Sequence, residues 1–342
     1  MSSKKGRGRW RAVVANAALI VVSLLVGPAM AEIGLRIAGI GYGNSPIEAS
    51  HRLHHQRPRN YEFIAYDPRG EYGGFPVRYD GSGHRVPGDP PKAAPGDRRV
   101  AFLGDSFTEG YTSAWKDTFV GQLGRANPGL VIRNYGVASY ASLQYLVQAK
   151  QDLPAFRPTD VVLQLFINDF DDDHMYLSRA SSADIDKVEW IDGGPRNLAI
   201  VVLRYSYLAR LLRRGQLMLS YMIAPPVDVA DEGKVASSHD LTLSILAATR
   251  REVERQGARF YLMVVPDKGL AQGNKCCADD TLSREVSAFA ARDGITYVDL
   301  AAAFGAKANQ AALYYRRDIH FTTAGHRLVA DTLAKAMGLR AP

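Results

Sequence analysis

Cysteine is nearly absent from this sequence of 342 residues, and its two copies are neighbours, Cys276 and Cys277. Adjacent cysteines cannot join distant parts of a chain, so no disulfide framework is expected, and a strained vicinal bridge and two free thiols both remain open. Internal repeats and low-complexity tracts are also absent. These absences exclude a small disulfide-stapled scaffold and a repeat protein.

Sets of metal-ligating side chains are scarce as well. His51, His54 and His55 lie close together in the sequence but have no carboxylate or cysteine partner at ligand spacing. The acidic run of residues 169–173 reads better as a solvated loop than as a metal site. The sequence therefore predicts no metal and no cofactor.

The net charge of +7 is concentrated at the start of the chain. Five cations and no acid stand there: Lys4, Lys5, Arg7, Arg9 and Arg11. The remainder of the chain is close to neutral, so the basic balance belongs to this tail alone. We therefore expect no nucleic-acid partner.

A long uncharged stretch follows the basic tail. Residues 12–31 carry no charged side chain and match the roughly 20 residues that a bilayer-spanning helix needs. Cations before an apolar span predict a cytoplasmic tail over residues 1–11, a single transmembrane anchor over residues 12–37 of the bacterial inner membrane, and a periplasmic remainder. The competing interpretation is a cleaved signal peptide, because Ala29-Met30-Ala31 resembles a cleavage site.

Two segments of different composition follow the predicted anchor. Residues 38–97 are rich in Gly, Pro, Tyr, His and Arg, which predicts a stalk that becomes a short β-containing lead-in. From residue 98 short apolar runs alternate with helical patterns, which predicts an α/β domain over residues 98–342 with a parallel sheet covered on both faces. The predicted strands are Val100–Leu103, Val131–Asn134, Val161–Phe166, Phe260–Val265 and Ile295–Val298, and the predicted helices cover residues 117–126, 140–156, 240–256, 281–293 and 322–337. Ligand sites in such sheets lie beyond the carboxyl ends of the strands.

Residues 171–236 interrupt this alternation and are predicted to form a cap-like insertion. They contain an apolar and basic helical pattern over residues 197–214. Three interpretations of that helix remain open: a cap over the active site, a second contact with the membrane surface, and plain packing.

Ser106 is the candidate nucleophile. The apolar run Val100–Leu103 ends in Gly104-Asp105-Ser106, where the glycine permits a tight turn and the hydroxyl falls at the carboxyl edge of the sheet. A serine in this position also serves as a plain helix N-cap, so the segment alone does not establish a nucleophile.

His320 is the candidate base for that serine. A serine nucleophile needs a base, and the base needs a carboxylate to hold its tautomer and orientation. Asp318 lies two residues before His320, so both side chains point to one side if the segment is extended. His326 is a rival base, although its position inside the last predicted helix favours packing or capping.

An acyl-transfer site also needs hydrogen-bond donors for the developing oxyanion. Two loops at predicted strand ends offer candidates: Gly136 with an unobstructed backbone N–H, and Asn168 with a side-chain amide. Either residue alone is weak evidence, because glycine in a turn and asparagine at a strand end are common.

Taken together and in this order, the segments resemble the SGNH hydrolases, also called GDSL-type esterases and lipases. Gly104-Asp105-Ser106, Gly136, Asn168-Asp169 and Asp318 with His320 match four ordered blocks over about residues 98–338. The resemblance implies a three-layer α/β/α, flavodoxin-like fold. It also implies a Ser106–His320–Asp318 triad and an oxyanion hole from the N–H groups of Ser106, Gly136 and Asn168.

The sequence departs from the family pattern at two positions. Phe166 stands where the third block usually has glycine, and only Ile319 separates Asp318 from His320 where two residues are usual. The shorter spacing is similar to that of some SGNH-type polysaccharide O-acetyltransferases and of membrane-anchored members.

These observations predict an ester-cleaving enzyme outside the cytoplasm. The first expectation is hydrolysis of an acyl or acetyl ester of a cell-envelope glycan or lipid. The alternative is an O-acyltransferase that moves an acetyl group to an exported polysaccharide with the same triad. A third possibility, a non-catalytic membrane-tethered assembly factor, is disfavoured by the intact set of Ser, His, Asp and Asn.

Overall fold

The computed structural model describes residues 3–40, 42–43, 46–67, 70–87, 97–195, 198–223, 239–271, 281–307 and 310–342. Cys276 and Cys277 lie outside the described residues, as do residues 224–236 of the predicted insertion. The predictions made for those segments therefore stay predictions.

A five-stranded parallel sheet forms the centre of the molecule, in the order β8-β7-β9-β10-β11. Its strands are β7 (Arg98–Leu103), β8 (Leu130–Asn134), β9 (Asp160–Leu165), β10 (Arg259–Val264) and β11 (Thr296–Val298). Numbered along the chain this order is 2-1-3-4-5, the flavodoxin-like arrangement. The predicted fold class is thus confirmed, and every predicted strand exists within one or two residues of its expected ends.

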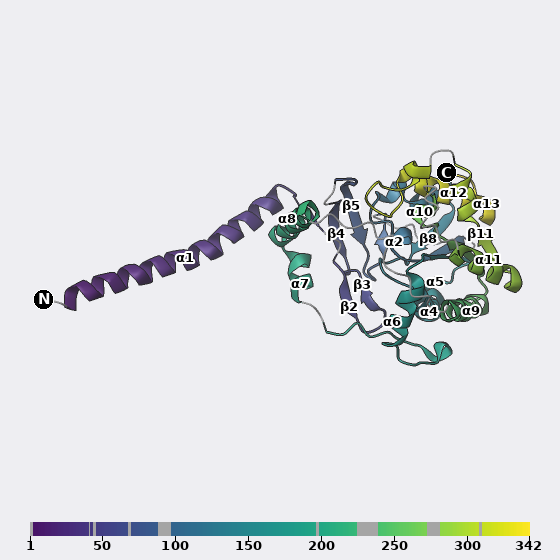
Figure 1. Cartoon of the computed structure of the whole chain (residues 1–342), viewed down its shortest axis with the longest axis horizontal. Helices are drawn as coiled ribbons and strands as arrows, with labels where there is room; N and C mark the ends of the chain where they lie inside the picture. Colours follow the sequence, from purple (N-terminus) through teal and green to yellow (C-terminus); the bar gives the residue numbers. More distant parts are fainter. Residues whose placement is uncertain are drawn as a thin grey trace.

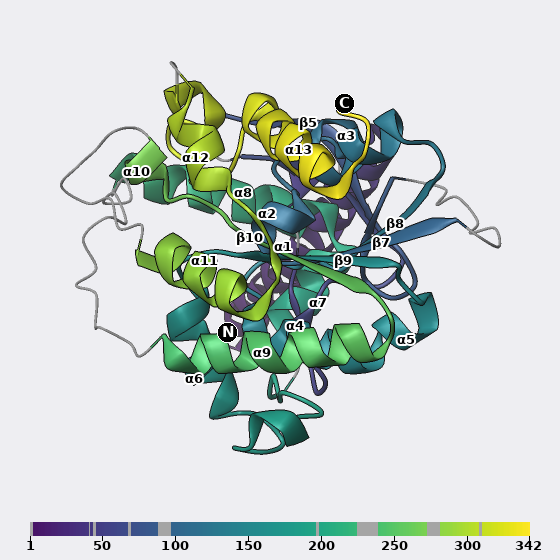
Figure 2. The same cartoon turned by 90° about the vertical axis from the view of Figure 1, so that its right-hand side faces the viewer.

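Helices cover both faces of this sheet (Figure 2). One face carries α3 (Phe119–Ala126), α12 (Leu300–Gly305) and α13 (Thr323–Met337), and the other carries α4 (Ser142–Gln151), α9 (Asp240–Arg255) and α11 (Thr281–Asp293). The shorter helices are α2 (Ser106–Glu109), η1 (Trp115–Asp117), α5 (Leu153–Phe156), α6 (Asp169–Leu177), η2 (Ile185–Lys187), α10 (Lys268–Ala271) and η4 (Gln310–Leu313). A separate hydrophobic core fills each side of the sheet, which is why the strands read as continuous apolar runs.

A charged cluster holds the amino ends of three neighbouring strands. Asp160 is fully buried and accepts hydrogen bonds from Arg98 Nε at 2.8 Å and Arg98 Nη2 at 2.9 Å. Arg259 Nη2 lies 2.7 Å from the same carboxylate. Because the carboxylate is paired on both sides, its burial is compensated, and β7, β9 and β10 are fixed in register.

The lead-in, predicted as a stalk that becomes a short β-containing segment, contains a four-stranded sheet. Its strands are β1 (Tyr42–Gly43), β4 (Tyr61–Tyr66), β5 (Gly73–Tyr79) and β6 (Arg85–Val86), in the order β1-β4-β5-β6, with a separate hairpin of β2 (Glu48–Ser50) and β3 (His54–Gln56). Alternate residues of β4 and β5 are buried in a small core of their own: Tyr61, Phe63, Ala65, Val77 and Tyr79. This core explains why the segment is ordered without a long apolar run.

The N-terminal helix α1 (Ser3–Ile37) projects away from the α/β domain (Figure 1). Its residues Val13–Ile37 are long and apolar enough to span a membrane, with none of the apolar window buried inside the molecule. The predicted N-terminal apolar helix is thus present.

Beside the end of α1 lie α7 (Leu198–Tyr205) and α8 (Tyr207–Ile223) (Figure 1). The prediction of a single helix over residues 197–214 was wrong, because the helix breaks at Ser206. Ser206 Oγ accepts a hydrogen bond from Ala209 N at 3.0 Å and so caps α8. The pair packs next to α1 and the lead-in sheet, and α8 contacts α1 and β1.

Candidate active site

Ser106 is the first residue of α2, directly after β7. Asp105 caps this short helix by accepting a hydrogen bond from Phe107 N at 2.8 Å. A Cβ atom at Gly104 would lie 2.2 Å from Thr108 Oγ1, so glycine is required here for close packing of the strand against α2. Together these contacts hold the Ser106 hydroxyl at the carboxyl edge of the sheet.

His320 lies in the loop before α13, far from Ser106 in sequence. The loop is fixed by a hydrogen bond from Tyr315 N to His320 O at 3.0 Å and by Thr322, which caps α13. The imidazole is nearly buried, with the Phe107 ring centroid 4.9 Å away. Packing against an aromatic ring limits rotation of the imidazole and keeps water away from one of its sides.

A chain of hydrogen bonds joins Ser106, His320 and Asp318. His320 Nε2 lies 2.8 Å from Ser106 Oγ, and His320 Nδ1 lies 2.5 Å from Asp318 Oδ1. Asp318 Oδ1 also accepts a hydrogen bond from His320 N at 2.9 Å. One intervening residue is therefore enough for the carboxylate to reach the imidazole.

His326, the rival base, lies inside α13 and packs against the rings of Phe119 and Phe321. Burial lowers its pKa to about 3, and neither ring nitrogen has a hydrogen-bond partner within the described residues. A buried neutral imidazole of this kind serves packing.

The sequence predicts that Gly136 donates its N–H to an oxyanion, and this role stays a prediction. That N–H is already used, because it donates to Asn134 Oδ1 at 2.9 Å. A Cβ atom at Gly136 would lie 2.6 Å from Glu109 N, so the residue is glycine because the loop packs against the backbone of α2. The glycine shapes the loop, and a different residue has a free donor.

That residue is Ser139, which sequence reasoning missed. Its φ of 63° is in the left-handed region, which costs a non-glycine residue about 1–2 kcal/mol. The neighbouring N–H groups are engaged, since Ala138 N donates to Glu109 Oε2 and Tyr140 N donates to Val137 O. Within the described part of the chain, the Ser139 N–H has no partner. Backbone strain next to an unused donor is typical of functional loops.

Asn168 lies at the end of β9, immediately before α6. One hydrogen of its side-chain amide is used, since Nδ2 donates to Asp172 Oδ2 at 2.6 Å. In the described ranges, the backbone N–H groups of Asn168 and Ser106 have no hydrogen-bond partner. Three loops at strand ends thus offer unused N–H donors, at Ser106, Ser139 and Asn168.

The acidic run after Asn168 is not a solvated loop, which corrects that prediction. Residues 169–173 lie in α6, where Asp169 and Asp173 are buried. Burial raises the pKa of Asp173 to about 7, although Thr242 and Leu143 N donate hydrogen bonds to it. Burial, together with the nearby Asp105 and Asp173 carboxylates, raises the pKa of Asp169 well above its ordinary value. Across the described residues, no three His, Cys, Asp or Glu side chains are placed to hold a metal ion.

The lead-in sheet contacts the site through Glu109, the last residue of α2. Arg57 donates two hydrogen bonds to the Glu109 carboxylate, each 2.9 Å long, and Tyr79 OH donates a third. Ala138 N donates to Glu109 Oε2 at 2.7 Å. One buried carboxylate therefore joins the lead-in sheet, the helix of Ser106 and the loop of Ser139.

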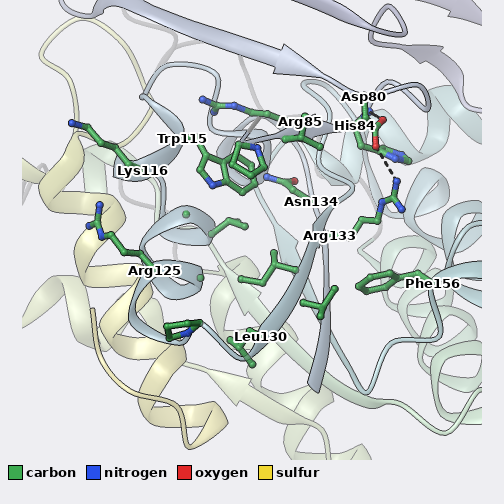
Figure 3. A pocket seen from close by; sticks show the side chains of 18 residues that line it. Asp80, His84, Arg85, Trp115, Lys116, Arg125, Leu130, Arg133, Asn134 and Phe156 are labelled. Atoms are coloured by element: carbon green, nitrogen blue, oxygen red, sulfur yellow. Dashed lines mark hydrogen bonds and ion pairs between the residues drawn. The ribbon is translucent and has the colours of Figure 1, made fainter. Parts of the chain in front are cut away.

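A cavity of about 490 Å³ lies elsewhere, between β6, α3 and the edge strand β8 (Figure 3). Its walls include Trp115, Leu130 and Phe156, and an ion pair of Asp80 and Arg133 closes one side. None of its lining residues is Ser106, His320 or Asp318. The cavity is therefore separate from the hydrogen-bonded chain of the candidate site.

The fold and this arrangement define the class of the protein. The site places a hydroxyl, an imidazole and a carboxylate in one hydrogen-bonded series at the carboxyl ends of parallel strands. Enzymes that hydrolyse esters or transfer acyl groups use this set of groups for catalysis. The protein is an enzyme of this class.

The comparisons with known proteins agree with that class. Residues 229–342 match the family model described as the SGNH hydrolase-like domain of the acetyltransferase AlgX, so the predicted resemblance to SGNH hydrolases is confirmed. No curated protein matches the chain.

Similar solved structures include a GDSL-like lipase from Bacteroides thetaiotaomicron, with 16% identity over 70% of this chain and 88% of that chain and a TM-score of 0.40. A catalytic mutant of an acetylxylan esterase from Geobacillus stearothermophilus has 18% identity over 72% of this chain and 98% of that chain, with a TM-score of 0.43.

Proposed function

We propose that the protein cleaves an acyl ester by forming an acyl-enzyme on Ser106, with His320 as general base and Asp318 as its orienting carboxylate. The observation that carries this proposal is the unbroken chain of hydrogen bonds from Ser106 Oγ through the imidazole to Asp318 Oδ1. A serine hydroxyl is a weak nucleophile until a base takes its proton, and that base is already in contact.

In the acylation step, Ser106 Oγ attacks the ester carbonyl as His320 Nε2 accepts its proton. Asp318 stabilises the imidazolium that results. The oxyanion accepts hydrogen bonds from the backbone N–H groups of Ser106 and Ser139 and from the second hydrogen of the Asn168 side-chain amide. His320 then returns the proton to the departing alcohol, and the acyl group remains on Ser106. In the second step, a water or a sugar hydroxyl attacks the acyl group as His320 Nε2 accepts its proton. The bond from the acyl carbon to Ser106 Oγ then breaks, His320 returns the proton to Oγ, and the free acid or the acylated sugar leaves.

The proposed substrate is an acyl or acetyl ester of a cell-envelope glycan or lipid, outside the cytoplasm. The basic tail before an apolar helix supports an N-terminus in the cytoplasm and a single span by α1. A reporter active only outside the cytoplasm, fused after Pro342, is expected to be active, and the chain is expected to stay with membranes after an alkaline wash. Release of a soluble product beginning at Glu32 would show a signal peptide instead.

Hydrolysis is the first function that we propose, because a serine acyl-enzyme next to a base needs only water to complete the cycle. Acetyl transfer to a glycan hydroxyl is the second, and the match of residues 229–342 to an acetyltransferase domain favours it. The two functions share the acyl-enzyme and differ in the acceptor. A transferase must exclude water from the place that the acceptor occupies.

Turnover of an activated acetyl ester by the full-length chain in detergent tests the shared step. Ser106→Ala is expected to abolish turnover and leave the unfolding transition unchanged. Ser244→Ala is a matched control, because Ser244 is exposed on α9 and its hydroxyl donates a hydrogen bond to Asp240 O at 2.7 Å, within its own helix. Equal turnover by Ser106→Ala and the wild-type protein would refute the assignment.

The products of the same reaction separate the two functions. Free acetate formed at a rate that no added oligosaccharide changes would support hydrolysis. Slow release of acetate with rapid acetylation of an added oligosaccharide would support transfer and displace hydrolysis as the first function.

A further inference from the structure

Helix α8 is amphipathic, but its apolar side faces outward and its charged side faces the protein, the reverse of a usual surface helix. Its exposed side carries Leu212, Leu219 and Ile223, whose exposed fractions are 64%, 56% and 75%. At 100° per residue these three positions form one stripe along the helix. Arg210 and Arg214 fall on the opposite side of the same helix, toward the protein.

The inward arginines pack on tyrosine rings of the lead-in sheet. The Arg210 guanidinium lies 5.1 Å from the Tyr61 ring centroid, and that of Arg214 lies 4.6 Å from the Tyr66 ring centroid. Arg210 is nearly buried and donates a hydrogen bond to Leu203 O at 2.8 Å. Water favours the opposite arrangement, with charges outside and leucines inside, so the medium outside α8 is expected to be apolar.

The preceding helix adds to this apolar surface. Leu198 and Val202 of α7 are 79% and 49% exposed, and Met222 at the end of α8 is 80% exposed. Exposed apolar side chains that gather on two neighbouring helices mark a contact with a membrane or with another protein. We call the exposed apolar side chains of Leu198, Val202, Leu212, Leu219, Met222 and Ile223 the α7–α8 apolar surface.

The start of α8 is fastened to the end of α1, the predicted membrane span. Glu32 of α1 accepts hydrogen bonds from the first N–H groups of α8, at 3.0 Å from Tyr207 N and 2.8 Å from Leu208 N. Ser206 Oγ donates to Glu32 Oε2 at 2.9 Å, and the Arg36 guanidinium donates to Tyr205 O at 2.5 Å. The carboxylate thus caps a helix that begins beside the last turns of α1.

We infer that the α7–α8 apolar surface lies in the outer face of the lipid bilayer that α1 spans. The inference rests on the proposed membrane anchor, because α1 is what brings this surface to the bilayer. Helices of this kind lie in the plane of the interface and bury their apolar side at the boundary of headgroups and acyl chains. Lipid is favoured over a protein partner because α8 leaves α1 at the point where the apolar span ends. The catalytic domain is then held against the membrane in one orientation by two elements.

Site-specific labels on the full-length chain in phospholipid vesicles test this inference. After replacement of the two natural cysteines by serine, single cysteines are introduced by Leu212→Cys, Leu219→Cys and Ile223→Cys and carry an environment-sensitive fluorophore. Lys187→Cys provides an aqueous control, since the Lys187 side chain is 76% exposed, and Leu24→Cys provides a control within α1, where Leu24 is 67% exposed. The readout is quenching by lipids that carry a nitroxide on the acyl chain.

Labels at positions 212, 219 and 223 are expected to show more than half of the quenching seen at position 24, whereas position 187 shows almost none. Quenching at position 24 with none on α8 would overturn this inference and leave the anchor intact. Absence of quenching at all positions would overturn the anchor as well. Disulfide-linked dimers through position 219 without quenching would show that a second copy of the chain covers the surface, which also overturns the inference.

Discussion

Arg57 and Glu109 form a buried ion pair that joins the lead-in segment, between β3 and β4, to the helix of Ser106. The exposed fractions of the two side chains are 2% and 0%, and two parallel N–H donors of the guanidinium meet the carboxylate. Burial alone raises the pKa of Glu109, but the charge of Arg57 outweighs it and holds that pKa below its ordinary value. The lead-in is therefore part of the catalytic unit rather than a spacer.

Loss of the arginine is expected to destabilise the fold strongly. Arg57→Leu leaves the Glu109 carboxylate buried without its cation, which costs about 3–5 kcal/mol of unfolding free energy. Arg327→Leu breaks a pair on the surface of α13 whose side chains are 47% and 41% exposed, and is expected to cost less than about 1 kcal/mol. Denaturant unfolding in detergent solution measures both. Equal effects of the two substitutions would contradict the structural role given to Arg57.

The two histidines of the last segment are expected to behave oppositely. His320→Ala removes the base and should lower kcat by about 10⁴-fold or more, as triad residues act as a unit. His326→Leu replaces a buried imidazole that lacks polar partners in the described residues, so activity should persist and stability should hold or rise. Steady-state kinetics and thermal unfolding of both variants check this. A severe loss of activity in His326→Leu, with little loss in His320→Ala, would show that His320 is not the base.

The buried Asp173 is expected to make the fold less stable as the pH rises. Its pKa is about 7 in the folded protein against an ordinary value of 3.8, so the folded state binds a proton more tightly than the unfolded state does. Its contribution to stability is therefore full below about pH 4 and is lost as the pH rises toward 7. Asp173→Asn carries no charge at any of these pH values: its Oδ1 accepts from Leu143 N in place of the carboxylate oxygen, and its Nδ2 donates to Thr242 Oγ1, which now accepts.

Asp105 and Asp169 are present in both the wild-type protein and Asp173→Asn. A difference between their two pH profiles of stability therefore reports on the Asp173 carboxyl. The free energy of unfolding of Asp173→Asn should exceed that of the wild-type protein at pH 8 and should change less between pH 4 and 7. Parallel pH profiles of the two proteins would show that Asp173 titrates normally.

The oxyanion donors are tested at Asn168. Asn168→Ala removes the side-chain amide and its hydrogen bond to Asp172, while Ser106 and His320 stay in place. We expect kcat to fall by about 10²–10³ with a small change in KM, because the donor acts on the charge of the transition state. An increase in KM at unchanged kcat would place Asn168 in substrate binding instead.

Ser139→Gly is the companion substitution, since glycine adopts the left-handed conformation without cost and keeps the N–H. Activity should be retained and stability should rise. A large loss of activity would show that the serine side chain, and not its backbone N–H, serves the reaction.

The strands were predictable because β7, β9 and β10 are buried on both faces, so that their residues are apolar without interruption. The contact of His320 with Ser106 and Asp318 was predictable because the chemistry limits the residue types and the strand ends limit their positions. Other features depend on contacts between distant segments, which a local pattern does not encode. The break at Ser206 depends on Glu32, and the pairing of Arg57 with Glu109 joins segments 52 residues apart.

Ser139 escaped prediction for a different reason. A positive φ is readable from a sequence when glycine occupies the position, and serine gives no such signal. Gly136 lies in the same loop, and its signal is ambiguous. In a sequence, a glycine that permits close packing looks the same as a glycine that leaves its backbone N–H free to donate.

In the proposed mechanism the acyl group passes through Ser106 with His320 as its base. Mass spectrometry of the full-length chain, quenched in acid during turnover of an activated acetyl ester and then digested, tests it most directly. One acetyl group is expected on the peptide that contains Ser106 in the wild-type protein, and none in Ser106→Ala or His320→Ala. Acetylation of another residue that disappears when turnover ends, or turnover that persists in Ser106→Ala, would contradict it.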